Sequence, residues 1–169
     1  KATELNQQIK SFNKAYQEFF EANYAKMMYK GASKETEAFL NFWSKKQENM
    51  KNTFLQNYIK YALANLEDIS GGNNKTLEST FIKGQPILYR HKEYMNFFTQ
   101  FYQEDFDQLT IKSGSQKMMK ALMFEGSLDR ALEELNIIKG FGSAELTELY
   151  LLYGLFEVYH KKVINQESS

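Results

Sequence analysis

The chain has 169 residues, of which 43% are hydrophobic and 15% aromatic, a composition too apolar for an intrinsically disordered segment. Its 21 Lys and Arg balance 21 Asp and Glu, so it lacks the basic excess with which nucleic-acid-binding proteins neutralise phosphate. The absence of cysteine excludes a disulfide, a zinc–thiolate site, an iron–sulfur cluster and a cysteine nucleophile within the chain. No apolar run is long enough to span a membrane. We therefore expect a folded domain that binds no nucleic acid.

We expect residues 1–169 to form a single helical domain. The sequence begins at Lys1 within a helical pattern, so we expect it to be a fragment of a longer protein. Apolar residues spaced by three and four positions predict a first helix over residues 2–29. Gly31 is expected to end that helix as a C-terminal cap. The apolar positions of this helix are Leu5, Ile9, Phe12, Tyr16 and Phe19.

Ser33 is the expected N-cap of the second helix, whose apolar side includes Phe39 and Trp43. The pattern weakens over residues 45–51, where the helix either bends or breaks and restarts near Asn52; its boundaries between Lys45 and Phe54 stay open. From Phe54 the helical period continues until Gly71-Gly72 ends it.

Residues 73–75 are expected to form a loop, followed by a short helix over residues 76–83. Gly84 and Pro86 stop that helix, because proline lacks the backbone donor and disfavours helix in the residue before it. One helix is then predicted over residues 91–109, with enough aromatic residues to be buried on more than one side.

The C-terminal part shows the clearest signals. A shorter helix is expected over residues 116–124, and Ser127 and Ser143 are the expected N-caps of two further helices. The tight connection Gly140-Phe141-Gly142 between those two predicts an antiparallel helical hairpin. The fold class is therefore all-α, with six to eight helices around an aromatic-rich core. Leu128 and the positions Leu146, Leu149, Leu152, Phe156 and Tyr159 of the last helix are expected to face inward.

No catalytic, cofactor-binding or metal-binding set is evident. His91 and His160 lie far apart and lack the spacing that puts two ligands on one helix face, so each is interpreted as a surface or capping residue. The pairs Glu133-Glu134 and Asp105/Asp107 could serve as an acid–base pair or as calcium ligands, but the pattern of a solvated helix face is favoured.

The aromatic richness is the one feature that points to a function, because exposed aromatic residues form surfaces that recognise glycans or proteins. Core filling is the favoured alternative, since the aromatic residues follow the helical period. If they are exposed, the candidate interaction surface comprises Tyr89, Tyr150 and Tyr153.

Residues 57–67 contain the pattern Y-x-x-Y-x-x-A-x-L-E, followed by Pro86-Ile87-Leu88-Tyr89 and by residues 94–98. Together with residues 127–128 and 145–156, these segments resemble the helical domain that precedes a thioredoxin-like domain in thiol–disulfide proteins of the Bacteroidetes cell envelope. The resemblance covers about two thirds of the chain and rests on packing motifs. It implies a location in the periplasm or outer cell envelope. The catalytic Cys-x-x-Cys of such proteins belongs to the other domain, so no catalytic residue is carried over.

Three functions are therefore open at this point. The first is a non-catalytic helical module without a cofactor, which positions a downstream thioredoxin-like domain or binds a protein partner. The second is a glycan- or peptide-binding module that uses exposed aromatics. The third is an enzyme of unrecognised type, which would require a cleft with convergent polar groups.

Overall fold

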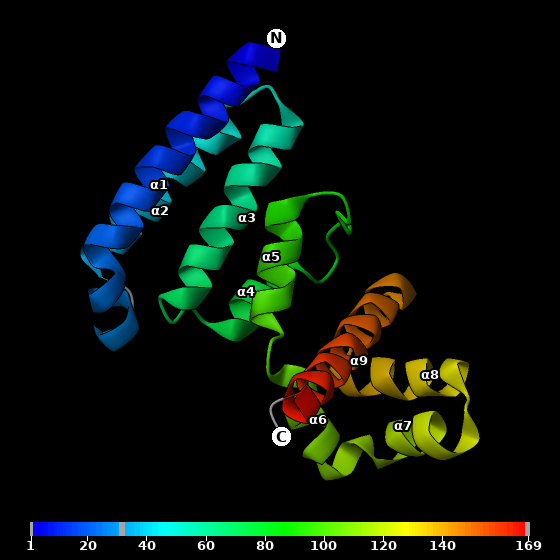
Figure 1. Ribbon diagram of the computed structural model, residues 1–169. Coiled ribbons are helices and arrows are strands. Elements are labelled where there is room, and N and C mark those ends of the chain that lie inside the picture. Colours follow the sequence, from blue (N-terminus) through cyan, green and yellow to red (C-terminus); the bar gives the residue numbers. More distant parts are fainter. Residues whose placement is uncertain (1, 31–32, 168–169) are drawn as a thin grey trace. The chain divides into compact units, whose positions relative to one another are not determined.

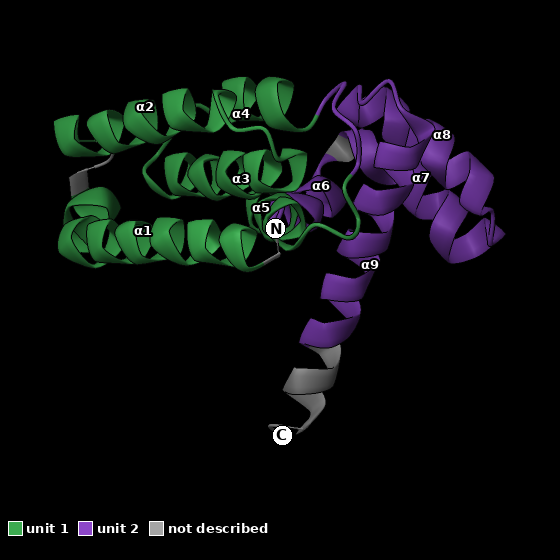
Figure 2. Ribbon diagram, turned by 90° about the horizontal axis from the view of Figure 1, so that it is seen from above, with its two compact units in different colours: residues 1–82, 88–101 green, residues 83–87, 102–169 purple. Residues whose placement is uncertain are grey.

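The computed structural model describes residues 2–30 and 33–167 (Figure 1). Regular structure within these ranges is entirely helical, which confirms the all-α prediction. The chain divides into two compact units, Lys1–Ile82 with Leu88–Phe101 and Lys83–Ile87 with Tyr102–Ser169 (Figure 2). The expectation of one domain over residues 1–169 stays a prediction, because compactness alone does not decide whether the two units unfold together. None of the described helices is long and apolar enough to cross a membrane.

Unit 1 consists of five helices, in which α1, α2 and α3 run alongside one another and α5 packs on α3 (Figures 1 and 2). Their bounds are α1 Ala2–Lys30, α2 Lys34–Glu48, α3 Thr53–Ile69, α4 Asn74–Phe81 and α5 Lys92–Phe101. Gly31, the expected cap of α1, lies outside the described residues.

Short polar side chains start three of these helices by accepting a hydrogen bond from a backbone N–H of the first turn. Ser33 caps α2 as predicted. Asn52 Oδ1 accepts from the N–H of Leu55 at 3.0 Å, so the chain breaks and restarts at Asn52 instead of bending. Asn73 caps α4 in the same way, which corrects the predicted loop over residues 73–75: the helix begins at Asn74.

The core of unit 1 follows α3, which contributes seven buried side chains. Phe12 of α1 and Trp43 of α2 meet edge to face beside the buried Leu55 and Ile59 of α3, with ring centroids 4.9 Å apart. Tyr61, in the middle of α3, meets Tyr94 of α5 in the same geometry, also at 4.9 Å. Such aromatic pairs each add about 1 kcal/mol beyond the burial of their area. Burial raises the pKa of Tyr61 to about 12, since the charged phenolate would lose its hydration.

Unit 2 contains α6 Asp105–Ile111, the short 3₁₀ segment Ser113–Ser115, α7 Gln116–Lys120, a π-helical segment Ala121–Glu125, α8 Leu128–Lys139 and α9 Ala144–Glu167. The prediction of one helix over residues 91–109 is wrong. A turn at residues 102–104 separates α5 from α6, and the N–H of Asp105 bonds to the carbonyl of Tyr102 instead of continuing the α-helical ladder.

The C-terminal helical hairpin forms at the predicted caps. Ser127 and Ser143 accept hydrogen bonds from first-turn N–H groups of α8 and α9. Gly140 ends α8 in the left-handed conformation, with φ of 60°, which a residue without a Cβ adopts at little cost. Helices α8 and α9, joined by residues 140–143, then pack against each other.

One close approach fixes α9 on α6. Gly154 lies in the middle of α9, where a Cβ atom would stand only 2.2 Å from two ring carbons of Phe106. The ring of Phe106 is buried and packs against Tyr150, with centroids 5.8 Å apart. The glycine is therefore required by packing, because any side chain at this position would overlap the ring.

Candidate functional site

The chemistry-bearing side chains are dispersed. Across residues 2–30 and 33–167, no three His, Cys, Asp or Glu side chains gather in a way that could hold a metal ion. His160 is exposed on α9, where its ring contacts Phe156 with centroids 4.3 Å apart.

His91 is buried, so it is not the surface residue that one of its two interpretations predicted; it stands directly before α5, where its carbonyl accepts from the N–H of Met95 at the start of the helix. Its Nε2 lies 3.1 Å from the carbonyl oxygen of Phe54, and because a carbonyl only accepts, Nε2 carries the proton. The imidazole also packs on the ring of Phe54, with centroids 4.7 Å apart. Its Nδ1 is buried without a hydrogen-bond partner in the described structure. His91 therefore joins the start of α3 to the start of α5.

Two consecutive carboxyl groups at the end of α3 have raised pKa values. Burial raises the pKa of Glu67. Burial also raises the pKa of Asp68, and a hydrogen bond from Gln100 offsets only part of that rise. Perturbed carboxyl groups are candidates for acid–base work. Consecutive residues of a helix point about 100° apart, however, so these two do not face each other as a catalytic pair.

The densest polar cluster lies inside unit 2 and joins α6, α8 and α9. Asp105 Oδ2 accepts from Lys139 Nζ at 2.7 Å and from the hydroxyl of Tyr150 at 2.5 Å. Lys139 Nζ also lies 5.0 to 5.7 Å from the ring centroids of Tyr102, Phe141 and Tyr150. Cation–π attraction and the ion pair therefore hold the same ammonium group. We name Asp105, Lys139 and Tyr150 the polar triad; Tyr150 is buried, and the side chains of Lys139 and Asp105 are 15% and 36% exposed.

The expectation that Asp105 and Asp107 lie on a solvated helix face holds in part, because their side chains are 36% and 40% exposed while each also forms an ion pair. Asp105 pairs with Lys139, and Asp107 pairs with Lys161 of α9. Lys83 Nζ donates to the carbonyl oxygen of Lys139 at 3.1 Å, so a cation meets the negative end of α8. These carboxylates and lysines thus serve to join helices, a role that their spacing in the sequence does not reveal.

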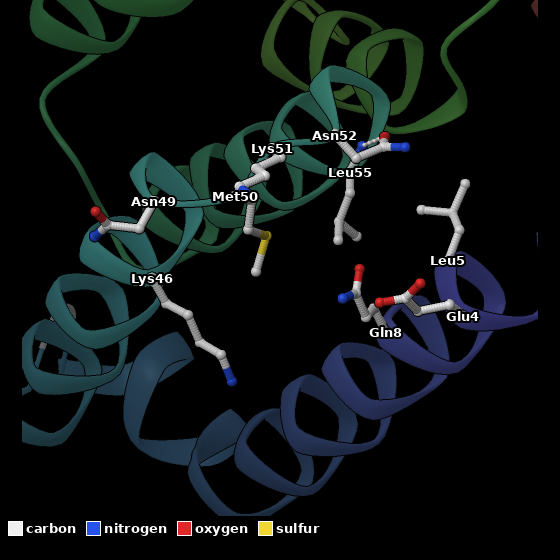
Figure 3. Close-up of a pocket in the computed structure, with 9 residues that line it drawn as sticks. All are labelled: Glu4, Leu5, Gln8, Lys46, Asn49, Met50, Lys51, Asn52 and Leu55. Carbon is white, nitrogen blue, oxygen red and sulfur yellow. Dashed lines mark hydrogen bonds between the residues drawn. The ribbon is translucent and has the colours of Figure 1, made fainter. Parts of the chain in front are cut away.

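An open groove of about 920 Å³ lies in unit 1 between the start of α1 and the corner that joins α2 to α3. Figure 3 shows Glu4 and Gln8 on one wall and Lys46 on the other, with the apolar side chains of Leu5 and Met50 beside them. The remaining lining residues are Asn49, Lys51, Asn52 and Leu55. The Lys46 ammonium lies 4.5 Å from the ring centroid of Trp43, which holds it on that wall. The groove has one acidic residue and no histidine, so it offers no acid–base pair.

The three tyrosines singled out from the sequence do not share one exposed surface. Tyr89 is 52% exposed and belongs to unit 1. Tyr150 is fully buried in unit 2, which corrects its place in an interaction surface. Tyr153 is partly buried, and burial, followed by the nearby charge of Glu157, raises its pKa to about 12. A glycan-binding platform made from these three residues is therefore not formed.

An apolar stripe that the sequence assigned to the core lies instead on the surface of α9. We call it the α9 face: Leu152, Leu155, Phe156 and Tyr159, which are 67%, 42%, 54% and 67% exposed. Their spacing of i, i+3, i+4 and i+7 puts them on one side of the helix. The opposite side carries the buried Thr147, Tyr150 and Gly154.

Leu128 is likewise exposed, at 56%, so it does not face the core as predicted. A contiguous set of large apolar side chains marks an interaction surface more strongly than scattered ones. The α9 face is therefore the better candidate.

Comparison with protein-family models, with curated proteins and with solved structures gave no match.

Proposed function

We propose that this chain is a non-catalytic helical module that binds a protein partner through the α9 face. The observation that carries the proposal is the exposure of Leu152, Leu155, Phe156 and Tyr159 over two consecutive turns. Hydrophobic burial supplies about 25 cal/mol per Å², so a partner that covers these side chains gains several kcal/mol before the costs of association. Aromatic residues at the centre of such a patch are typical binding hot spots.

The packing of α9 supports this role. Gly154 on Phe106 and the polar triad fix the first half of α9 on the core of unit 2. The apolar stripe is thus presented by a helix that is already in place, and a partner does not have to order it. Preorganisation of this kind lowers the cost of association.

The resemblance described above supplies a context in which such a module positions a downstream thioredoxin-like domain in the periplasm or outer envelope. This context is part of the proposal. In such a protein the thioredoxin-like domain carries out the redox chemistry, and the helical module holds that domain in position.

Site-specific photo-cross-linking in the cell that makes the protein tests the proposal. A photoreactive phenylalanine analogue replaces Phe156 in one variant and Ile137 in a matched control; Ile137 is an apolar residue of α8 in the same unit and is 76% exposed. We expect a discrete protein adduct from position 156 that position 137 does not give, and its loss when Leu152→Glu is added. Equal labelling at both positions, or none at 156, would contradict the proposal.

A further inference from the structure

The charges along α9 indicate what covers the α9 face. Glu145 and Glu148 are exposed in the first part of the helix, on the same side as Leu152 and Tyr159, because positions 145, 148, 152, 155 and 159 follow one another in steps of three and four. The apolar part comes next, and Lys162, three positions after Tyr159, continues the same series in the sequence. Lys161 lies on the other side of the helix, where it pairs with Asp107. The series of positions thus begins acidic, continues apolar and ends basic.

When one copy of this series is reversed against another, its acidic end faces the basic end of the other copy and the central apolar positions face each other. Two such helices placed antiparallel, with the twofold axis between positions 152 and 155, bring Leu152 of one copy opposite Leu155 of the other. The same register puts Glu148 opposite position 159 and Glu145 opposite position 162, the basic end of the series, in the second copy. A parallel arrangement would instead place Glu145 and Glu148 opposite their own copies, and like charges facing each other disfavour it.

The exposed apolar area is sufficient for a weak, specific contact. Four side chains of this size and exposure offer roughly 500 Å² per copy, so that a symmetric pair buries roughly 1,000 Å², at the lower end of specific interfaces. We infer that the partner of the α9 face is a second copy of this chain, bound as an antiparallel helix pair with twofold symmetry. The inference rests on the proposed function, since it names the partner of that same face.

Sedimentation equilibrium of the chain across micromolar to millimolar concentrations tests the pairing. We expect a monomer–dimer equilibrium with a dissociation constant on the order of micromolar. Leu152→Glu places a carboxylate at the centre of the apolar contact and should weaken association about tenfold or more. The control Ile137→Glu introduces the same charge at a comparably exposed apolar position and should leave the dissociation constant unchanged. A monomer at every concentration, or equal effects of the two variants, would overturn the inference.

The absence of cysteine allows a direct test of orientation. In the antiparallel pair, the two copies of position 148 stand about 16 Å apart along the helix, beyond the limit of about 7 Å between Cα atoms for a disulfide. Under mild oxidation, Glu148→Cys alone should therefore stay uncross-linked, whereas a mixture with Tyr159→Cys should give the mixed disulfide dimer. Cross-linking of Glu148→Cys to itself would overturn the antiparallel arrangement.

The two proposals fail separately. A photo-adduct from position 156 that joins two copies of the chain agrees with both. An adduct with a different protein, together with a monomer in sedimentation, keeps the protein-binding function and overturns the second copy as partner.

Discussion

Gly154→Ala tests how α9 is fixed on α6. In an exposed helix the change would stabilise the protein by about 1 kcal/mol, because alanine has the higher helix propensity. Here the new Cβ atom would stand 2.2 Å from two carbons of the Phe106 ring. An ordinary contact needs about 3.4 Å or more. The ring or the helix must therefore shift by more than an ångström.

Phe106 cannot retreat easily, because it is only 4% exposed and packs on Tyr150. Overpacking of this kind costs about 1–3 kcal/mol, so after the gain in propensity we expect a net loss of about 1–2 kcal/mol in the free energy of unfolding. Urea titration followed by circular dichroism measures it.

The matched control is Gly114→Ala, where an added Cβ meets nothing within 4 Å and the effect should be close to zero. Adding Phe106→Leu to Gly154→Ala should recover part of the loss, giving a coupling energy between the two sites. A stabilising or neutral Gly154→Ala would refute the proposed packing of α9 on Phe106.

Three further outcomes follow from the contacts. Asp105→Ala leaves Lys139 among aromatic rings without its counter-ion and should lower the free energy of unfolding by about 1–3 kcal/mol. Asp105→Asn keeps a hydrogen-bond acceptor and should lower it by less. Equal losses in the two variants would contradict the role of the charge. Asn52→Ala removes the acceptor for the N–H of Leu55 and should cost about 1 kcal/mol, with Asn52→Asp retaining most of the stability in the same urea titration. Tyr61, with its pKa raised from 10.0 to about 12, ionises in the unfolded chain before it does so in the folded one. The contribution of Tyr61 to the free energy of unfolding is therefore present below pH 10. It is lost between pH 10 and 12, by up to about 1.4 kcal/mol per pH unit. Tyr61→Phe should make that decline less steep, and an unchanged pH dependence would contradict the shift.

Local signals accounted for most helix starts and ends. Ser33, Ser127 and Ser143 were identifiable because a capping side chain acts within its own turn. The break between α5 and α6 was not predictable in this way, since residues 102–104 contain neither glycine nor proline. Their turn belongs to the packing of Tyr102 in unit 2, which local sequence does not encode.

The interaction surface was harder to predict because residues 149–156 of α9 are apolar on every side of the helix. Periodicity grouped Leu146, Leu149, Leu152 and Phe156 together as core, but it cannot say which side of such a helix another element covers. Tyr150 shows the converse case: it was a candidate for the interaction surface, yet it is buried and its hydroxyl donates to Asp105. One signal was available in Gly154, since an isolated glycine within a helical pattern indicates a close approach, and that approach identifies the packed side of α9.

The yield of photo-adducts from position 156 against position 137 tests the protein-binding role of α9 most directly, because it compares two exposed apolar sites of one folded unit. We predict a discrete adduct at 156 that disappears with Leu152→Glu, and background labelling at 137. Indistinguishable labelling at the two positions would mean that the α9 face has no preferred protein contact in the cell and would contradict the proposed function.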